Sequence, residues 1–233
     1  MVIGDSFALG WGVAFDKIFS QQLQKKLSKS YKNIEVINTG VGNYNSVMQN
    51  EFFKSKGLKF KPDLVVLMFV FNDAEPTPKL LSGSELFLRT NFYLYSFFFN
   101  LWLTVAANFN QDFNWENYYS NLYSENNASM KEAEAALDDL IDTLKKNNIK
   151  IIVANIPELR DLKNYKIDVA TNFIKNIAIN KQVNFIDFHD FLVDQNPESL
   201  WVSKEDPHGN AKAYDIMSDA VLKKIKSKNL LTR

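Results

Sequence analysis

Ser6 and His208 are the two side chains of this sequence best suited to nucleophilic catalysis. Ser6 ends a Gly-Asp-Ser motif directly after a short apolar run, and His208 follows the acidic residues Glu205 and Asp206. A serine becomes a strong nucleophile when a neutral imidazole accepts its proton, and the imidazole needs a carboxylate on its other nitrogen. The residue types therefore predict a Ser6–His208 pair with one of these two acids behind it.

Each motif also has an ordinary structural explanation. A serine that follows a strand frequently caps a helix, and a histidine in a polar loop can lie there without any role in proton transfer. By itself the Gly-Asp-Ser motif favours a helix-capping role for Ser6 over a catalytic one. The occurrence of both motifs in one chain favours catalysis.

Two other positions can stabilise a developing negative charge. Asn72 follows the longest apolar run, and its side-chain amide can donate to an oxyanion, although an Asx turn is the alternative explanation. The loop 40–46 contains Gly42 and Asn43, which tolerate the positive φ angles that aim backbone amides at an anion. A plain strand-to-helix turn would need the same residue types.

Alternating apolar runs and amphipathic stretches predict the elements that position these residues. Five continuous apolar runs are typical of parallel strands covered on both faces, and they span residues 1–4, 34–38, 63–71, 149–155 and 183–187. Helical spacing of apolar residues occurs at 16–27, 129–147, 165–180 and 210–226, and Ser129 with Glu132 forms a capping-box signature. The pattern predicts an α/β fold with a doubly wound, mostly parallel five-stranded sheet.

The predicted topology brings the candidate residues to one edge of the sheet. Ser6 and Asn72 each follow a predicted strand, and ligands of open α/β sheets bind outside the carboxyl ends of the strands. A second histidine, His189, also follows a strand, and we interpret it as a structural residue. No repeat or linker divides the chain, so residues 1–233 are predicted to form one domain.

The segment 90–111 has no charged residue and many aromatic ones, within an aromatic-rich insertion at about 80–125. Asparagine and threonine interrupt it, and a membrane span there would separate Ser6 from His208, so we do not expect a span. The alternatives are helices packed on the sheet edge, or a lid, acyl-binding wall or membrane-contacting face near the site.

Composition excludes several classes of function. The 27 basic and 27 acidic residues give a formal net charge of zero, which argues against a nucleic-acid partner. There is no cysteine and there are two histidines, so neither a thiolate site nor a metal site is predicted.

The first residues contain no signal peptide, which indicates a cytoplasmic protein on the chain as given. The predicted first strand is short for a buried one. We therefore expect that residues are missing upstream of Met1. If they include an export signal or an anchor, the protein would be extracytoplasmic or anchored.

Four segments together resemble the conserved blocks of the SGNH/GDSL hydrolases, in the family's order. They are Gly-Asp-Ser at 4–6, Asn-Thr-Gly-Val-Gly-Asn-Tyr at 38–44, Phe-Asn-Asp at 71–73 and Asp-Pro-His-Gly-Asn at 206–210. The resemblance spans residues 1 to about 225. It implies a flavodoxin-like, three-layer α/β/α sandwich and ester hydrolysis through a covalent acyl-enzyme, without a cofactor. Ser6 would be nucleophile and backbone oxyanion donor, Asn72 the side-chain donor and His208 the base.

The sequence departs from the family pattern at three positions. The glycine of the second block aligns with Asn43, while Gly42 lies one position earlier, so the oxyanion donor there is an amide of one of the two. Val70 replaces a usual glycine. The family acid commonly stands three residues before the histidine, where this chain has Glu205. We assign the acid to Asp206, because Asp-x-His-x-Asn variants also resemble the family, and keep Glu205 as the alternative.

The resemblance predicts a carboxylic ester hydrolase acting on a small-molecule, glycan or lipid ester. An O-acyltransferase would use the same site with a glycan or another alcohol as acceptor. A non-catalytic flavodoxin-like binding module is the alternative from another class, since fold alone does not determine function.

Overall fold

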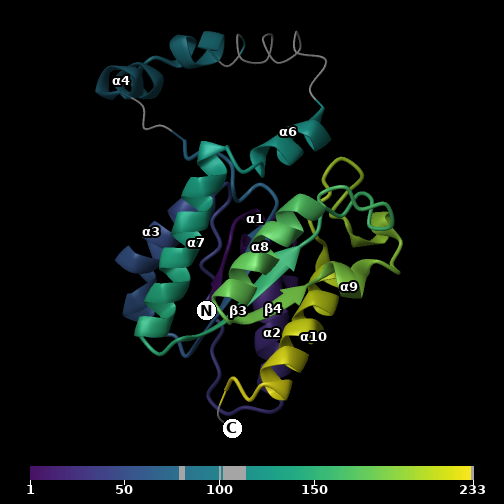
Figure 1. Ribbon diagram of the computed structural model, residues 1–233. Coiled ribbons are helices and arrows are strands. Elements are labelled where there is room, and N and C mark those ends of the chain that lie inside the picture. The colour runs from purple at the N-terminus through teal and green to yellow at the C-terminus, as the bar shows by residue number, and fades with distance from the viewer. Residues whose placement is uncertain (79–81, 100, 102–113, 232–233) are drawn as a thin grey trace.

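A parallel sheet of four strands forms the centre of the computed structural model, which describes residues 1–78, 82–99, 101 and 114–231 (Figure 1). The strands lie in the order β1-β2-β3-β4. Their bounds are Val2–Ile3, Leu64–Val70, Lys150–Ile156 and Asn184–Asp187. All pairs are parallel, with Val2 opposite Val66 and Ile152 opposite Asn184. Four of the five predicted strands are therefore confirmed.

The prediction of a fifth strand at 34–38 is wrong for the described structure. This segment runs alongside β1, but only Val2 and Asn38 form a bridge. The N–H of Val36 donates to the side-chain oxygen of Gln24 at 2.8 Å instead of to a strand. Because β1 has only two residues, it offers too few backbone groups for a regular ladder.

The predicted helices are confirmed with shifted ends. They correspond to α2 (Phe19–Leu27), α7 (Ala128–Lys146), α8 (Asp168–Asn180) and α10 (Ala211–Ser227). The capping box at Ser129 is not formed, because α7 begins earlier and the side chain of Asn127 accepts the N–H groups of Ser129 and Met130. Other helices of the described residues are α1 (Ser6–Leu9), α3 (Ser46–Ser55), α4 (Gly83–Asn91), α6 (Trp115–Leu122) and α9 (His189–Leu192).

Helices cover both faces of the sheet, which makes three layers (Figure 1). Along β2, Val66 and Met68 belong to one apolar cluster with residues of α2 and α10. Val65 and Leu67 belong to a second cluster with residues of α7 and α8. Every residue of β2 is buried. Burial on two faces explains why this strand is a continuous apolar run rather than an alternating one.

The aromatic segment is described only in part, because residues 100 and 102–111 lie outside the described ranges. α4 contains no buried residue, the helical stretch 93–99 exposes Tyr93 to 81%, and Figure 1 places both apart from the sheet. The prediction that the aromatic segment forms helices packed on the sheet edge is therefore wrong for α4 and for the stretch 93–99. Within the ranges that the structure describes, no helix has both the length and the apolar character needed to span a membrane.

Candidate active site

Ser6 stands at the point where β1 turns into α1, beyond the carboxyl end of the strand. A Cβ on Gly4 would lie 2.8 Å from the carbonyl oxygen of Met68, so only glycine fits against the neighbouring strand. Asp5 caps α1 by accepting the N–H of Phe7 at 2.9 Å. The capping role that a serine could have filled is thus taken by the aspartate, and the Ser6 hydroxyl lies 3.3 Å from the other carboxylate oxygen of Asp5.

Ser6, His208 and Asp206 form a continuous chain of hydrogen bonds. The Ser6 Oγ lies 2.9 Å from His208 Nε2, across 202 positions of sequence. On the other side of the imidazole ring, Nδ1 lies 2.5 Å from Asp206 Oδ1. The same oxygen accepts the backbone N–H of His208 at 3.0 Å. With the proton on Nδ1, this geometry leaves Nε2 free to accept the serine proton.

The environment of Asp206 favours its ionised form. Partial burial raises the pKa of this carboxyl, but hydrogen bonds from the ring and the backbone of His208 outweigh that effect and hold the pKa below its ordinary value. Glu205 has no contact of this kind. Its Oε2 accepts the hydroxyl of Ser203 at 3.0 Å. Of the two candidate acids, Asp206 alone contacts the histidine.

The loop that carries His208 is fixed by the start of α10. Asn210 caps this helix and donates from its side chain to the carbonyls of Ser199 and Trp201. Trp201 also pairs with Gly209 in an antiparallel bridge. These contacts hold the imidazole ring next to Phe7, with 4.9 Å between ring centroids.

Asn72 lies close to Ser6 in the turn that follows β2. A side-chain hydrogen bond from Asn72 lowers the pKa of Asp5, against the larger effect of burial, which raises it. The carbonyl oxygen of the Asn72 side chain is buried and accepts no hydrogen bond from any described residue. The turn is held from the side of α6 by Tyr123, whose hydroxyl donates to the carbonyl of Phe71 at 2.6 Å.

Gly42 and Asn43 lie in a loop tied to β1 through the N–H of Val41, which donates to the Gly4 carbonyl at 3.1 Å. Asn43 has a φ of 64°, a left-handed conformation that glycine adopts most easily. Asparagine is among the few other residues that tolerate it, which explains how Asn43 replaces a glycine here. Neither residue lines the cleft that contains Ser6.

One open cleft of about 450 Å³ brings the other predicted residues together. Ser6, Asn72, Glu205, Asp206 and His208 all line it. It lies beyond the carboxyl ends of β1, β2 and β3, the usual position for a site in an open α/β sheet. The other residues that line the cleft come from the start of α1, the end of β2, α6, the loop after β3 and the loop before α10. They are Asp5, Phe7, Val70, Phe71, Tyr119, Glu158, Leu159, Arg160 and Pro207.

Sequence reasoning missed several residues at this site, among them Trp11, Tyr119 and Arg160. Trp11 donates its indole N–H to Asp206 Oδ2 at 3.2 Å, and Tyr119 and Arg160 line the cleft. Arg160 follows the end of β3, so its place beyond a predicted strand was an available signal. No pattern in the sequence pairs Trp11 with an acid 195 positions away.

His189 contacts neither Ser6 nor Asp206. Its Nε2 lies 2.7 Å from the carbonyl oxygen of Leu162, in the loop that follows β3. This contact supports the interpretation of His189 as a structural residue. Among the described residues, no group of three or more metal-binding side chains is arranged to hold a metal ion.

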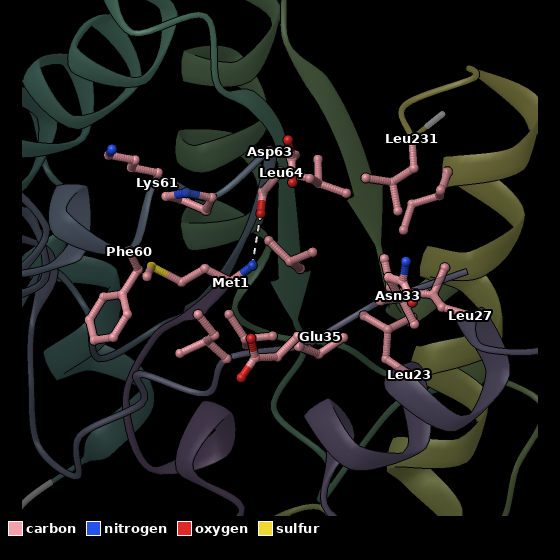
Figure 2. A pocket seen from close by; sticks show the side chains of 17 residues that line it. Met1, Leu23, Leu27, Asn33, Glu35, Phe60, Lys61, Asp63, Leu64 and Leu231 are labelled. Carbon is pink, nitrogen blue, oxygen red and sulfur yellow. Dashed lines mark hydrogen bonds between the residues drawn. The ribbon is translucent and has the colours of Figure 1, made fainter. Parts of the chain in front are cut away.

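A second cavity, of about 240 Å³, lies at the opposite ends of the strands (Figure 2). Apolar side chains such as Leu23, Leu27 and Leu231 line it together with Glu35 and Asp63. The backbone nitrogen of Met1 donates to the carbonyl of Leu64 at 2.8 Å. No serine or histidine is among its described lining residues, so the paired nucleophile and base belong to the other cleft.

The cleft lies in a three-layer α/β fold, and comparison with known proteins supplies the family. Residues 2–216 match the model of the GDSL-like lipase/acylhydrolase family, and the chain belongs to this family. No curated protein matches the sequence.

Solved structures confirm the fold. TesA superposes with a TM-score of 0.65 at 15% identity, over 99% of this chain and 98% of TesA. A catalytic mutant of Axe2, an acetylxylan esterase from Geobacillus stearothermophilus, gives 0.63 at 18% identity over 96% and 92%. The esterase EstA from Pseudoalteromonas sp. gives 0.56 at 15% identity over 97% of each chain. At these identities the likeness concerns the fold.

Proposed function

We propose that the protein hydrolyses carboxylic esters through a covalent acyl-enzyme formed on Ser6. One observation carries this proposal, the chain of contacts from Ser6 Oγ to His208 Nε2 at 2.9 Å and from His208 Nδ1 to Asp206 Oδ1 at 2.5 Å. Nucleophile, base and orienting acid are the three parts that an activated serine requires. Their place in an open cleft gives an ester access to the hydroxyl.

In the first half-reaction, His208 Nε2 accepts the proton of Ser6 as Oγ bonds to the carbonyl carbon of the ester. The carbonyl π electrons move onto the oxygen and create the tetrahedral oxyanion. When the intermediate collapses, the bond to the alkoxy oxygen breaks and His208 returns the proton to the leaving alcohol. In the second half, water replaces the alcohol, and the same steps release the carboxylic acid and restore Ser6.

Three donors are assigned to the oxyanion. They are the backbone N–H of Ser6, the side-chain amide of Asn72 and, on the family resemblance alone because neither residue lines the cleft, a backbone N–H at Asn43 or at Gly42 beside it. Within the described chain, the N–H groups of Ser6 and Asn43 donate to no other residue. Asn72 lines the same cleft as Ser6, which supports its place in this set.

Asp206 is assigned as the acid of the site in preference to Glu205. Its Oδ1 contacts Nδ1 of the His208 ring and also accepts the backbone N–H of His208. Its lowered pKa keeps the carboxylate ionised, and an ionised partner stabilises the imidazolium that forms during proton transfer. Glu205 is directed to Ser203 instead.

The proposal is tested by labelling with a fluorophosphonate, read by intact mass, together with turnover of p-nitrophenyl acetate. The wild-type protein should take up one adduct, and Ser6→Ala should take up none and lose turnover. Ser203→Ala is the matched control, because this serine donates to Glu205 beside the cleft and has no base. Persistence of the adduct in Ser6→Ala, or no adduct on folded wild-type protein, would contradict the proposal.

A further inference from the structure

The loop between β3 and α8, residues 157–167, forms one wall of the cleft and is anchored at two points. The indole N–H of Trp201 donates to the carbonyl of Leu159 at 3.0 Å, and His189 Nε2 lies 2.7 Å from the carbonyl of Leu162. Leu159 and Leu162 are each 1% exposed, so both anchors are in the core. Arg160 stands between them and is held on a fixed stretch of backbone.

Glu158 fixes the guanidinium group of Arg160. Its Oε1 accepts Arg160 Nη1 at 2.7 Å, and its Oε2 accepts the backbone N–H of the same arginine at 2.8 Å. The Glu158 side chain is 6% exposed, whereas that of Arg160 is 53% exposed. A buried carboxylate therefore holds one edge of a guanidinium group whose other part faces solvent.

The rest of the guanidinium group is available to a ligand. Within the described chain, Nε and Nη2 of Arg160 donate to no residue. Arg160 lines the same cleft as Ser6 and His208. Arginine presents its N–H groups as a rigid planar fork, which suits paired oxygen acceptors. The free N–H groups are thus positioned donors beside the proposed nucleophile.

The charges around Arg160 select the kind of oxygen that it binds. Glu158 offsets its positive charge, and Glu205 and Asp206 line the same cleft. A carboxylate or phosphate on the substrate would meet like charges there, which is costly at close range. Hydroxyl oxygens accept from a guanidinium group without that repulsion, and they can donate to the nearby carboxylates.

We propose that Arg160, held by Glu158, binds free hydroxyl groups on the alcohol part of the ester, so that the substrates are acyl esters of uncharged polyols or sugars. This inference rests on the ester hydrolysis proposed above. It assigns Arg160 to substrate binding and places the alcohol, rather than the acyl group, against the loop 157–167.

Three small substrates test it with the whole protein. Glycerol 1-monoacetate and propyl acetate differ by two hydroxyl groups, and 3-acetoxypropionate adds a carboxylate to a similar frame. In wild type, kcat/KM for glycerol monoacetate should exceed that for propyl acetate by about tenfold, the effect of one charge-assisted hydrogen bond. 3-Acetoxypropionate should be the poorest of the three.

Arg160→Ala should remove the preference for glycerol monoacetate, mainly by raising KM, and leave propyl acetate within about twofold of wild type. Because this change leaves Glu158 buried without its partner, Glu158→Gln combined with Arg160→Ala provides a second variant without an uncompensated charge. Lys166→Ala is the matched control. Lys166 lies on the same loop, is also 53% exposed and pairs with Glu116 at 2.7 Å, but it does not line the cleft.

The outcomes separate this inference from the proposed function. Loss of the preference in both Arg160 variants, with the preference retained in Lys166→Ala, supports the assignment. Turnover of all three esters with no effect of Arg160, or an Arg160-dependent preference for 3-acetoxypropionate, overturns it and leaves ester hydrolysis intact. A folded wild-type protein that turns over no ester overturns both proposals.

Discussion

The indole N–H of Trp11 donates to Oδ2 of Asp206 at 3.2 Å, while Oδ1 of the same carboxylate contacts His208. Both carboxylate oxygens are therefore engaged, and rotation of the Asp206 side chain about its terminal bond is restrained. Trp11 is 55% exposed, so its ring also forms part of the outer surface beside the site.

Trp11→Phe should lower kcat for p-nitrophenyl acetate by about three- to tenfold and leave KM nearly unchanged. The ring is kept and one hydrogen bond to the acid is lost, which is an effect of about 1 kcal/mol. Steady-state kinetics provide the measurement, and Phe15→Ala, at a position 71% exposed, is a surface control. An unchanged kcat would show that Asp206 needs no second partner.

Asp206→Asn and Glu205→Gln distinguish the two candidate acids. We expect Asp206→Asn to lower kcat by about a thousandfold or more, because an amide favours the wrong tautomer of His208 and does not stabilise the imidazolium. Glu205→Gln should remain within about twofold, since Glu205 contacts Ser203 rather than the imidazole. The reverse order of effects would move the acid to Glu205.

Asn72→Ala should lower kcat by about a hundredfold with little change in KM, because an oxyanion donor acts in the transition state and not in the bound ester. Single-turnover acylation with p-nitrophenyl acetate measures the step directly. Asn43→Gly is a useful comparison: it keeps the backbone N–H and suits the φ of 64°, so its kcat should stay close to wild type. A hundredfold loss in Asn43→Gly, or none in Asn72→Ala, would contradict these roles.

Asp73→Asn should change how stability depends on pH. Burial raises the pKa of Asp73 well above its ordinary value, and the charge of Asp5 raises it further. A raised pKa means that the folded protein binds this proton more tightly than the unfolded chain. The contribution of this bound proton to the free energy of unfolding is therefore fully present below the ordinary aspartate pKa of 3.8. It is lost as the pH rises through the pKa of Asp73 in the folded protein.

Urea unfolding of wild type and Asp73→Asn across that pH window measures the difference. The free energy of unfolding of wild type should fall relative to that of the variant as pH rises. The amide can still accept the N–H of Val70, which Asp73 accepts at 3.0 Å. A constant difference would show that Asp73 ionises normally in the folded protein.

The sequence was most informative where residues are buried on both sides. β2 and β3 are continuous apolar runs, and both were predicted to within one residue at their ends, because burial on two faces leaves little freedom of composition. The same criterion, a continuous apolar run, led to the wrong prediction of a strand at 34–38. Its apolar residues are also typical of a strand, but β1 is too short to pair with it.

The site was predictable where chemistry and motif coincide. Ser6, Asp206, His208 and Asn72 all line one cleft, as their places after strands and before α10 indicated. The sequence did not indicate that Asp5 would cap α1, nor that Trp11 and Arg160 would reach the site. Those depend on side-chain contacts between segments far apart in the chain, which no local pattern encodes.

Tyr119 of α6 and Tyr123, the residue directly after this helix, hold the turn that carries Asn72. Tyr119 donates to Glu75 and Tyr123 to the carbonyl of Phe71, each at 2.6 Å. The chain therefore leaves this turn after Glu75 and returns to contact it again at Tyr119 and Tyr123. The segment between Glu75 and Tyr119 thus begins and ends at the same turn. Closure entropy grows only slowly with the length of such an excursion. The segment between Glu75 and Tyr119 can thus be lengthened, shortened or exchanged at little thermodynamic cost, without moving the turn that carries Asn72.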